Sequence, residues 1–207
     1  MTDYLLQAFA TLFVIIDPIA LAPIFLGVTR GQTAEQRRKT AITASLTATG
    51  ILVGFALVGA QFLELVGISI PAFRIAGALL MFAIAFEMVF EKPHERSPDK
   101  VDEAREAPGD VSVFPLAIPL TSGPGAISAT VLISSNAPNV WGLAGVIAII
   151  LGIMAVVFVI FATAGRIARV LGNTGQAIVT RLLGVLLAAL AVQFVADGVR
   201  ALVTGIF

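Results

Sequence analysis

Long apolar stretches alternate with short polar segments along the whole chain. A helix needs about 20 predominantly apolar residues to cross the hydrocarbon core of a bilayer. Stretches of suitable length and composition cover residues 4–28, 41–62, 70–90, 113–135, 141–165 and 177–204. This pattern predicts an all-α membrane protein with six transmembrane helices.

Prolines and glycines interrupt the first and the fourth of these stretches. Pro18 and Pro23 lie inside the first, where each proline removes a backbone donor and crowds the preceding turn. The fourth carries prolines and glycines throughout residues 115–125, so it cannot form a regular helix. Lipid offers no partners to the backbone groups that such breaks release. We therefore predict that transmembrane helices 1 and 4 are interrupted and face a polar cavity.

The two halves of the chain resemble each other. Residues 74–80 read RIAGALL and residues 181–187 read RLLGVLL, while Asp-Pro at 17–18 corresponds to Gly-Pro at 123–124. Because each half contains an odd number of spans, the second half enters the membrane from the opposite side. We predict an inverted 3+3 repeat, an architecture that places transporter binding sites near the midplane between repeats. The predicted parts are a first repeat at 1–90, a charged cytoplasmic loop at 91–112 and an inverted second repeat at 113–207.

Lysine and arginine in the connecting segments predict the orientation. The segments after the first, third and fifth spans hold most of them, and all three segments fall on one side. Such residues accumulate in cytoplasmic loops. We therefore expect both termini outside and, for a bacterial chain, location in the inner membrane.

Composition supports a membrane location and excludes several functions. Hydrophobic residues make up 58% of the chain and charged residues 13%, with a mean hydropathy of +0.99, whereas soluble domains are about 45–50% apolar and 25% charged. The net charge of zero argues against a nucleic-acid partner. There is no cysteine, and the single histidine, His94, lies in the charged loop. We therefore expect no metal site, no cofactor and no enzyme.

Asp17 is the strongest candidate for a functional residue in the first span. An ionised carboxylate at mid-depth costs about 2.5–3.5 kcal/mol on insertion scales, so such residues usually face a functional cavity. Alternatively, Asp17 caps a second half-helix that begins at Pro18. The two interpretations are compatible, and Asp17 and Pro18 are candidate substrate-binding residues.

The fourth span offers a second candidate site. A turn at residues 121–125 followed by a new helix would direct free N–H groups and a positive dipole end into the membrane, where they attract an anion. The alternative is a kinked or re-entrant helix whose glycines only permit close packing. The candidate substrate-binding residues here are Thr121, Ser122, Gly123, Pro124, Gly125 and Ser128.

Polar residues in the third and sixth spans are further candidates. Gln193 lies near mid-depth and can serve either as a helix-packing contact or as a ligand. Arg74 and Arg181 occupy equivalent positions near opposite membrane faces, where each could extend to the headgroups or point toward a substrate. The glutamate and aspartate residues near the span ends carry less functional weight, because solvation is cheap there.

These motifs resemble the MarC family of small six-span membrane proteins. The resemblance rests on Asp-Pro at 17–18 with Pro-Ile-Phe at 23–25, on residues 117–126, and on RLLG at 181–184 with Gln193 and Asp-Gly at 197–198. At residues 20–21 this chain has Ala-Leu where many members have Gly-Asn. Similar proteins are classed as transporters of small neutral amino acids such as glycine and alanine, so the resemblance implies that substrate class.

The leading functional hypothesis is a secondary transporter of a small zwitterionic solute, embedded in the lipid bilayer. Asp17 would pair with the ammonium group of the solute, or would instead carry a coupling proton or bind sodium. The half-helix at residues 122–126 would receive the carboxylate. No Walker A motif is present, so a gradient would drive transport. The alternative is a non-transporting membrane partner or sensor that uses the charged loop for docking.

Overall fold

The chain folds as a bundle of helices. The computed structural model describes residues 1–90 and 111–205, and every element in these ranges is helical. The elements are α1 (Thr2–Ile16), α2 (Pro18–Val28), α3 (Ala34–Val66), α4 (Ile70–Phe90), the π-helix η1 (Ser112–Thr121), α7 (Pro124–Ser135) and α8 (Val140–Thr204). The predicted all-α class is confirmed for these residues. The predicted charged loop lies almost entirely outside the described part of the chain.

α3 is longer than the predicted span at 41–62 because its ends have strong helix signals. A capping box starts it: the Thr33 hydroxyl accepts a hydrogen bond from the Gln36 backbone N–H, and the Gln36 side chain accepts one from the Thr33 N–H. Gly67, with φ 80°, ends it in the left-handed conformation that glycine adopts readily. Residues 34–40, expected in a loop, therefore form the first turns of α3.

α8 joins the predicted spans at 141–165 and 177–204 into one bent helical element. No proline occurs between Val140 and Thr204, and the helical backbone is interrupted at one residue, Gly172. Gly172 makes the bend, with φ 60° and ψ 177°, a conformation accessible mainly to glycine. The expected loop between these spans is thus a helical corner.

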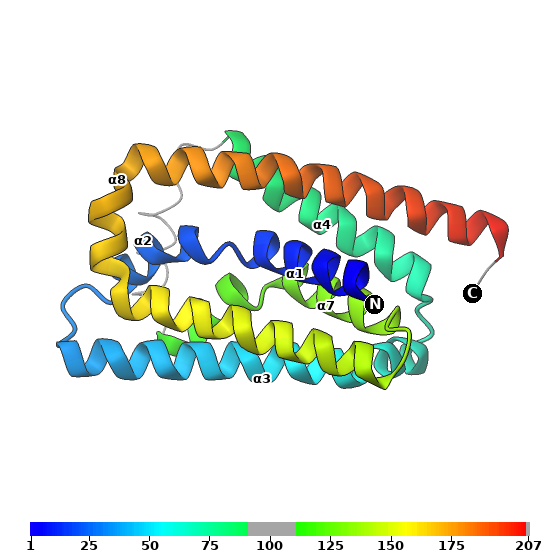
Figure 1. Cartoon of the computed structure of the whole chain (residues 1–207), viewed down its shortest axis with the longest axis horizontal. Helices are drawn as coiled ribbons and strands as arrows, with labels where there is room; N and C mark the ends of the chain where they lie inside the picture. Colours follow the sequence, from blue (N-terminus) through cyan, green and yellow to red (C-terminus); the bar gives the residue numbers. More distant parts are fainter. Residues whose placement is uncertain (91–110, 206–207) are drawn as a thin grey trace.

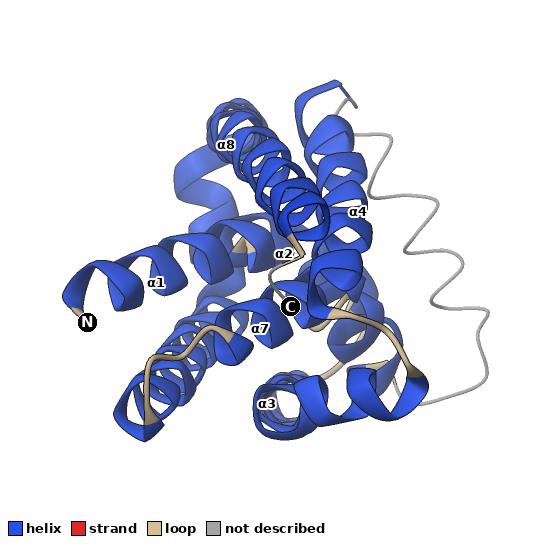
Figure 2. Ribbon diagram, turned by 90° about the vertical axis from the view of Figure 1, so that its right-hand side faces the viewer, coloured by secondary structure: helices blue, strands red, loops and turns tan. Residues whose placement is uncertain are grey.

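The two halves of α8 run back along the bundle on either side of α1 and α2 (Figure 1). α1 begins and α8 ends at the same end of the bundle, where α3 also connects to α4 (Figure 1). The segment between α2 and α3 and the bend at Gly172 lie at the opposite end. α7 lies inside the bundle in contact with α1, α3 and α4 (Figure 2).

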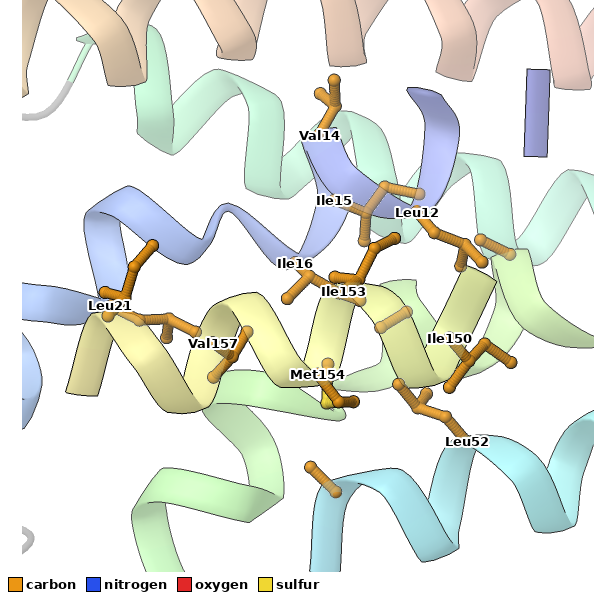
Figure 3. Packing of buried hydrophobic residues seen from close by; sticks show 14 of the residues in the cluster. Leu12, Val14, Ile15, Ile16, Leu21, Leu52, Ile150, Ile153, Met154 and Val157 are labelled. Carbon is orange, nitrogen blue, oxygen red and sulfur yellow. The ribbon is translucent and has the colours of Figure 1, made fainter. Parts of the chain in front are cut away.

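A continuous apolar core joins α1, α2, α3 and the first half of α8 (Figure 3). Phe25 of α2 and Phe161 of α8 are fully buried and stack with ring centroids 4.4 Å apart. Ala41, Ala44 and Ala48 on one face of α3 are also fully buried. Small residues allow helix backbones to approach closely, which is the usual basis of packing in membranes.

The outer surface of the bundle is strongly apolar. Leu65, Val140 and Trp141 are at least 80% exposed, and many other large apolar side chains face outward. Five helical stretches in the described residues are long and apolar enough to cross a membrane: Thr2–Val28, Ala34–Val66, Ile70–Phe90, Val140–Ile167 and Thr174–Thr204. The predicted fourth span instead consists of two short helices, η1 and α7. These helices agree with the predicted multi-pass membrane protein, while helix length in the described residues does not provide a sixth crossing.

Candidate functional site

Asp17 forms the break between α1 and α2. Its backbone is left-handed, with φ 42° and ψ 68°, and its N–H donates to the Phe13 carbonyl over 3.0 Å. Its Oδ1 accepts a hydrogen bond from the Ala20 N–H over 3.3 Å, and Pro18 follows as the first residue of α2. Aspartate tolerates this conformation and is a preferred N-cap, and proline suits the first helical position. The expected break is confirmed, and Asp17 is buried within it.

The second break separates η1 from α7. The Thr121 hydroxyl donates to the Leu116 carbonyl over 2.7 Å, and the Ser122 hydroxyl and N–H both donate to the Ala117 carbonyl over 2.8 Å. Pro124 begins α7, and a Cβ at Gly123 would collide with the Pro119 carbonyl oxygen. The predicted turn and new helix are confirmed. The two hydroxyls, however, donate to the π-helix backbone.

Both breaks border one cavity of about 250 Å³. Asp17, Ala20 and Leu21 line it from the first break, and Glu87 and Met88 line it from the end of α4. The second break contributes Thr121, Gly123, Pro124, Gly125 and Ala126. We name this space the break cavity. The tertiary fold thus brings together two chain interruptions that lie about half the sequence apart.

Two kinds of polar group border the break cavity, among lining residues that are mostly apolar. Asp17 and Glu87 are acidic residues in this lining. The start of α7 also borders the cavity and has no side-chain cap, and helix geometry leaves the N–H groups of Gly125 and Ala126 without acceptors inside the helix. A helix N-terminus favours negative charge and carboxylates favour positive charge. The cavity can therefore bind a solute that carries both.

The remaining predicted site residues lie outside the break cavity. Ser128 packs against α4, where a Cβ at Gly77 would lie only 2.6 Å from the Ser128 Cβ. Gln193 is exposed and donates a hydrogen bond to Asp197 on its own helix over 3.0 Å. Arg181 is exposed on α8. Arg74 lines a different cavity near the start of α4.

Glu87 lines the break cavity, although its position in the sequence gave it little weight as a site residue. It lies in the last turn of α4, where solvation by headgroups or water is cheap, and position alone gives it little weight. The signal available in the sequence was an acidic residue within the apolar stretch at 70–90. Within residues 1–90 and 111–205, no three His, Asp or Glu side chains are grouped as metal ligands.

Comparison with known proteins identifies the family. The family model described as MarC family integral membrane protein matches residues 2–203. The UPF0056 membrane protein YhcE of Escherichia coli is 36% identical over 199 residues, covering 96% of this chain and 93% of the relative. The UPF0056 membrane protein YvbG of Bacillus subtilis is 33% identical over 202 residues, covering 97% and 96%.

The similarity extends to an archaeal protein and to no solved structure. A UPF0056 membrane protein of Pyrococcus abyssi is 36% identical over 200 residues, covering 94% of this chain and 96% of the relative. None of the solved structures matches the chain. The names of these relatives state membrane location and no activity. From the match over nearly its whole length, the chain belongs to the MarC family of integral membrane proteins.

Proposed function

We propose that this protein is a secondary transporter that carries a small zwitterionic solute across the inner membrane by alternating access. The observation that carries the proposal is the break cavity, which is bordered both by the buried residue Asp17 and by the start of α7, a helix without a side-chain cap. Interrupted helices that meet at a polar cavity are a recurring feature of transporter binding sites.

The cavity supplies opposite partners for the two charges of an amino acid. Asp17 and Glu87 attract the ammonium group, and the N–H groups of Gly125 and Ala126 attract the carboxylate. Of the two carboxylates, one would pair with the solute, and the other would bind a coupling proton or a sodium ion. Glycine and alanine are the first candidates, because the family resemblance implies small neutral amino acids.

An inverted repeat accounts for how such a site would open alternately. Asp17 and Gly123 are both N-caps of half-helices that begin with proline, which supports equivalent roles in repeats at 1–90 and 113–207. The basic segment between α2 and α3 lies at the same end as the α8 bend (Figure 1). This arrangement supports a cytoplasmic position for that end, with both termini outside.

The first test is uptake and counterflow of labelled glycine and alanine in proteoliposomes. Asp17→Asn should reduce flux about tenfold or more, because a hydrogen bond to a charged group contributes about 1.5–3 kcal/mol. Asparagine also tolerates the left-handed conformation and serves as an N-cap, so the break itself should survive. Asp3→Asn, an exposed change in the first turn of α1, is the matched control.

Two results would contradict the proposal. One is unchanged saturable flux in Asp17→Asn, which would remove the break cavity from transport. The other is absence of flux by the wild type across a panel of small neutral amino acids. Thermal unfolding of each purified variant separates a lost site from a lost fold.

A further inference from the structure

A second cavity, of about 210 Å³, lies near the ends of several helices. Its polar lining comes from Tyr4, Gln7 and Thr11 of α1, Arg74 of α4, Asn136 after α7, and Asp197 of α8. We name it the terminal cavity, because it lies where α1 begins and α8 ends. A single water needs only about 10–15 Å³ of such space, so a small solute fits.

The two charged groups of the terminal cavity have opposite sign and are not paired. Within the described part of the chain, the Arg74 guanidinium forms no hydrogen bond or ion pair. The Asp197 carboxylate accepts a hydrogen bond from Gln193 over 3.0 Å and has no lysine or arginine nitrogen of residues 1–90 or 111–205 within ion-pair distance. Among the described residues, no other charged residue lines the cavity. The space thus offers one cationic and one anionic partner that do not neutralise each other directly.

The uncharged polar groups hold the wall in place. The Tyr4 hydroxyl donates to the Ile133 carbonyl over 2.7 Å, joining α1 to α7. The Asn136 amide donates to the Leu132 carbonyl over 2.6 Å and closes the end of α7. Because the Tyr4 and Asn136 donors are already engaged, Arg74 and Asp197 are the main polar side chains left to bind a ligand.

A packed layer separates the terminal cavity from the break cavity. Ser128 contacts Gly77, and a Cβ at Gly125 would lie 2.9 Å from Ile84 and 3.6 Å from Ile15. These contacts join α1, α4 and α7 between the two spaces. The terminal cavity is therefore a separate site on the other side of the layer.

We propose that the terminal cavity is a second binding site for the zwitterionic solute, at which Arg74 binds the carboxylate and Asp197 binds the ammonium group. The identity of the solute rests on the proposed function, and the site itself rests on the unpaired charges. A guanidinium binds a carboxylate with two parallel hydrogen bonds. The site would receive solute before it enters the break cavity, or after it leaves.

Cysteine labelling tests this site without relying on transport. The chain contains no cysteine, so Gln7→Cys places a single thiol on the cavity wall. Val140→Cys is the matched control, because Val140 is 80% exposed near the same end and does not line the cavity. The variants are reconstituted in phosphatidylglycerol liposomes, which have no zwitterionic headgroups, and are labelled with a membrane-impermeant maleimide.

Alanine should slow labelling of Gln7→Cys and leave that of Val140→Cys unchanged. The concentration of alanine that protects should rise about tenfold or more when Arg74→Gln or Asp197→Asn is added, since each change removes a charged hydrogen bond. Propionate and ethylamine, which each carry one of the two charges, should protect about tenfold less well than alanine. Asp17→Asn should leave protection intact.

The outcomes separate this inference from the proposed function. Flux without protection of Gln7→Cys would overturn the terminal site and leave transport standing. Protection without flux would support the site and contradict transport. If Asp17→Asn abolished protection, the alanine that protects would be bound in the break cavity, and the inference would be overturned. Protection that appears only when phosphatidylethanolamine is added, and not with alanine, would identify a lipid headgroup and also overturn it.

The labelling experiment still tests the inference if one of the two charge variants fails to fold. Arg74→Gln and Asp197→Asn are read separately, and the ligand series requires only Gln7→Cys. Equal protection by alanine, propionate and ethylamine would contradict recognition of both charges.

Discussion

Asp17 occupies three structural positions at once. Its left-handed conformation ends α1, its carboxylate caps α2, and it lines the break cavity. Asparagine can fulfil the first two roles and removes the charge. Comparison of the two residues therefore separates the contribution of the charge from that of the helix break.

At the residue scale we predict that Glu87→Gln raises the KM for a transported amino acid about tenfold and changes the maximal rate little. Glu87 lines the same cavity as Asp17, and loss of a charge-assisted hydrogen bond that is equally strong throughout the cycle weakens binding only. Concentration-dependent uptake in proteoliposomes measures both parameters. Glu64→Gln, on the exposed end of α3, is the control. A KM equal to that of the wild type would remove Glu87 from the binding site.

At the element scale the contact between α4 and α7 depends on glycine. A Cβ at Gly77 would lie 2.6 Å from the Ser128 Cβ and 3.0 Å from its Oγ, so the helices are as close as their side chains allow. A Cβ added at Gly54 on α3 would have no neighbouring atom within 4 Å. The two glycines therefore have different structural roles in similar helices.

This difference predicts opposite effects on stability. Gly77→Ala should destabilise the fold by about 1–3 kcal/mol through overpacking, whereas Gly54→Ala should stabilise it by about 0.5–1 kcal/mol through helix propensity. Thermal unfolding of purified protein in detergent measures both. Adding Ser128→Gly to Gly77→Ala should recover part of the loss. An equal response at both glycines would contradict the close contact between α4 and α7.

At the whole-molecule scale the basic residues and the helix ends predict one topology. The start of α3, with Lys39 and its neighbours, lies at the opposite end of the bundle from the segment between α7 and α8 (Figure 1). Lysine and arginine near membrane ends favour the cytoplasm. An impermeant maleimide should therefore label Asn136→Cys in intact cells and label Ala34→Cys only after permeabilisation. The reverse pattern would contradict the predicted orientation, including the location of both termini outside.

Local properties of the chain were predictable from the sequence. Apolar stretches and helix-breaking residues can be read from short segments of the sequence. The helices, the breaks at Asp17 and Gly123, and the family resemblance could therefore be recognised. The last two spans were predicted correctly as separate helices, but the segment between them was expected to be a loop and is helical on both sides of the kink at Gly172. The length of α3 was underestimated because its capping box at Thr33 and Gln36 lies before the apolar stretch, which begins at residue 41.

The sequence by itself determined where this protein is apolar, where its helices break and which charges it places near those breaks. Only the tertiary structure decided that the two breaks border one cavity, that Glu87 reaches it and that Arg74 and Asp197 line another. Helix rotation and packing set which side chains share a space, and these depend on contacts between residues far apart in the sequence. Gln193 illustrates the reason: its mid-span position was evident, but the packing of α8 left it on the exposed face.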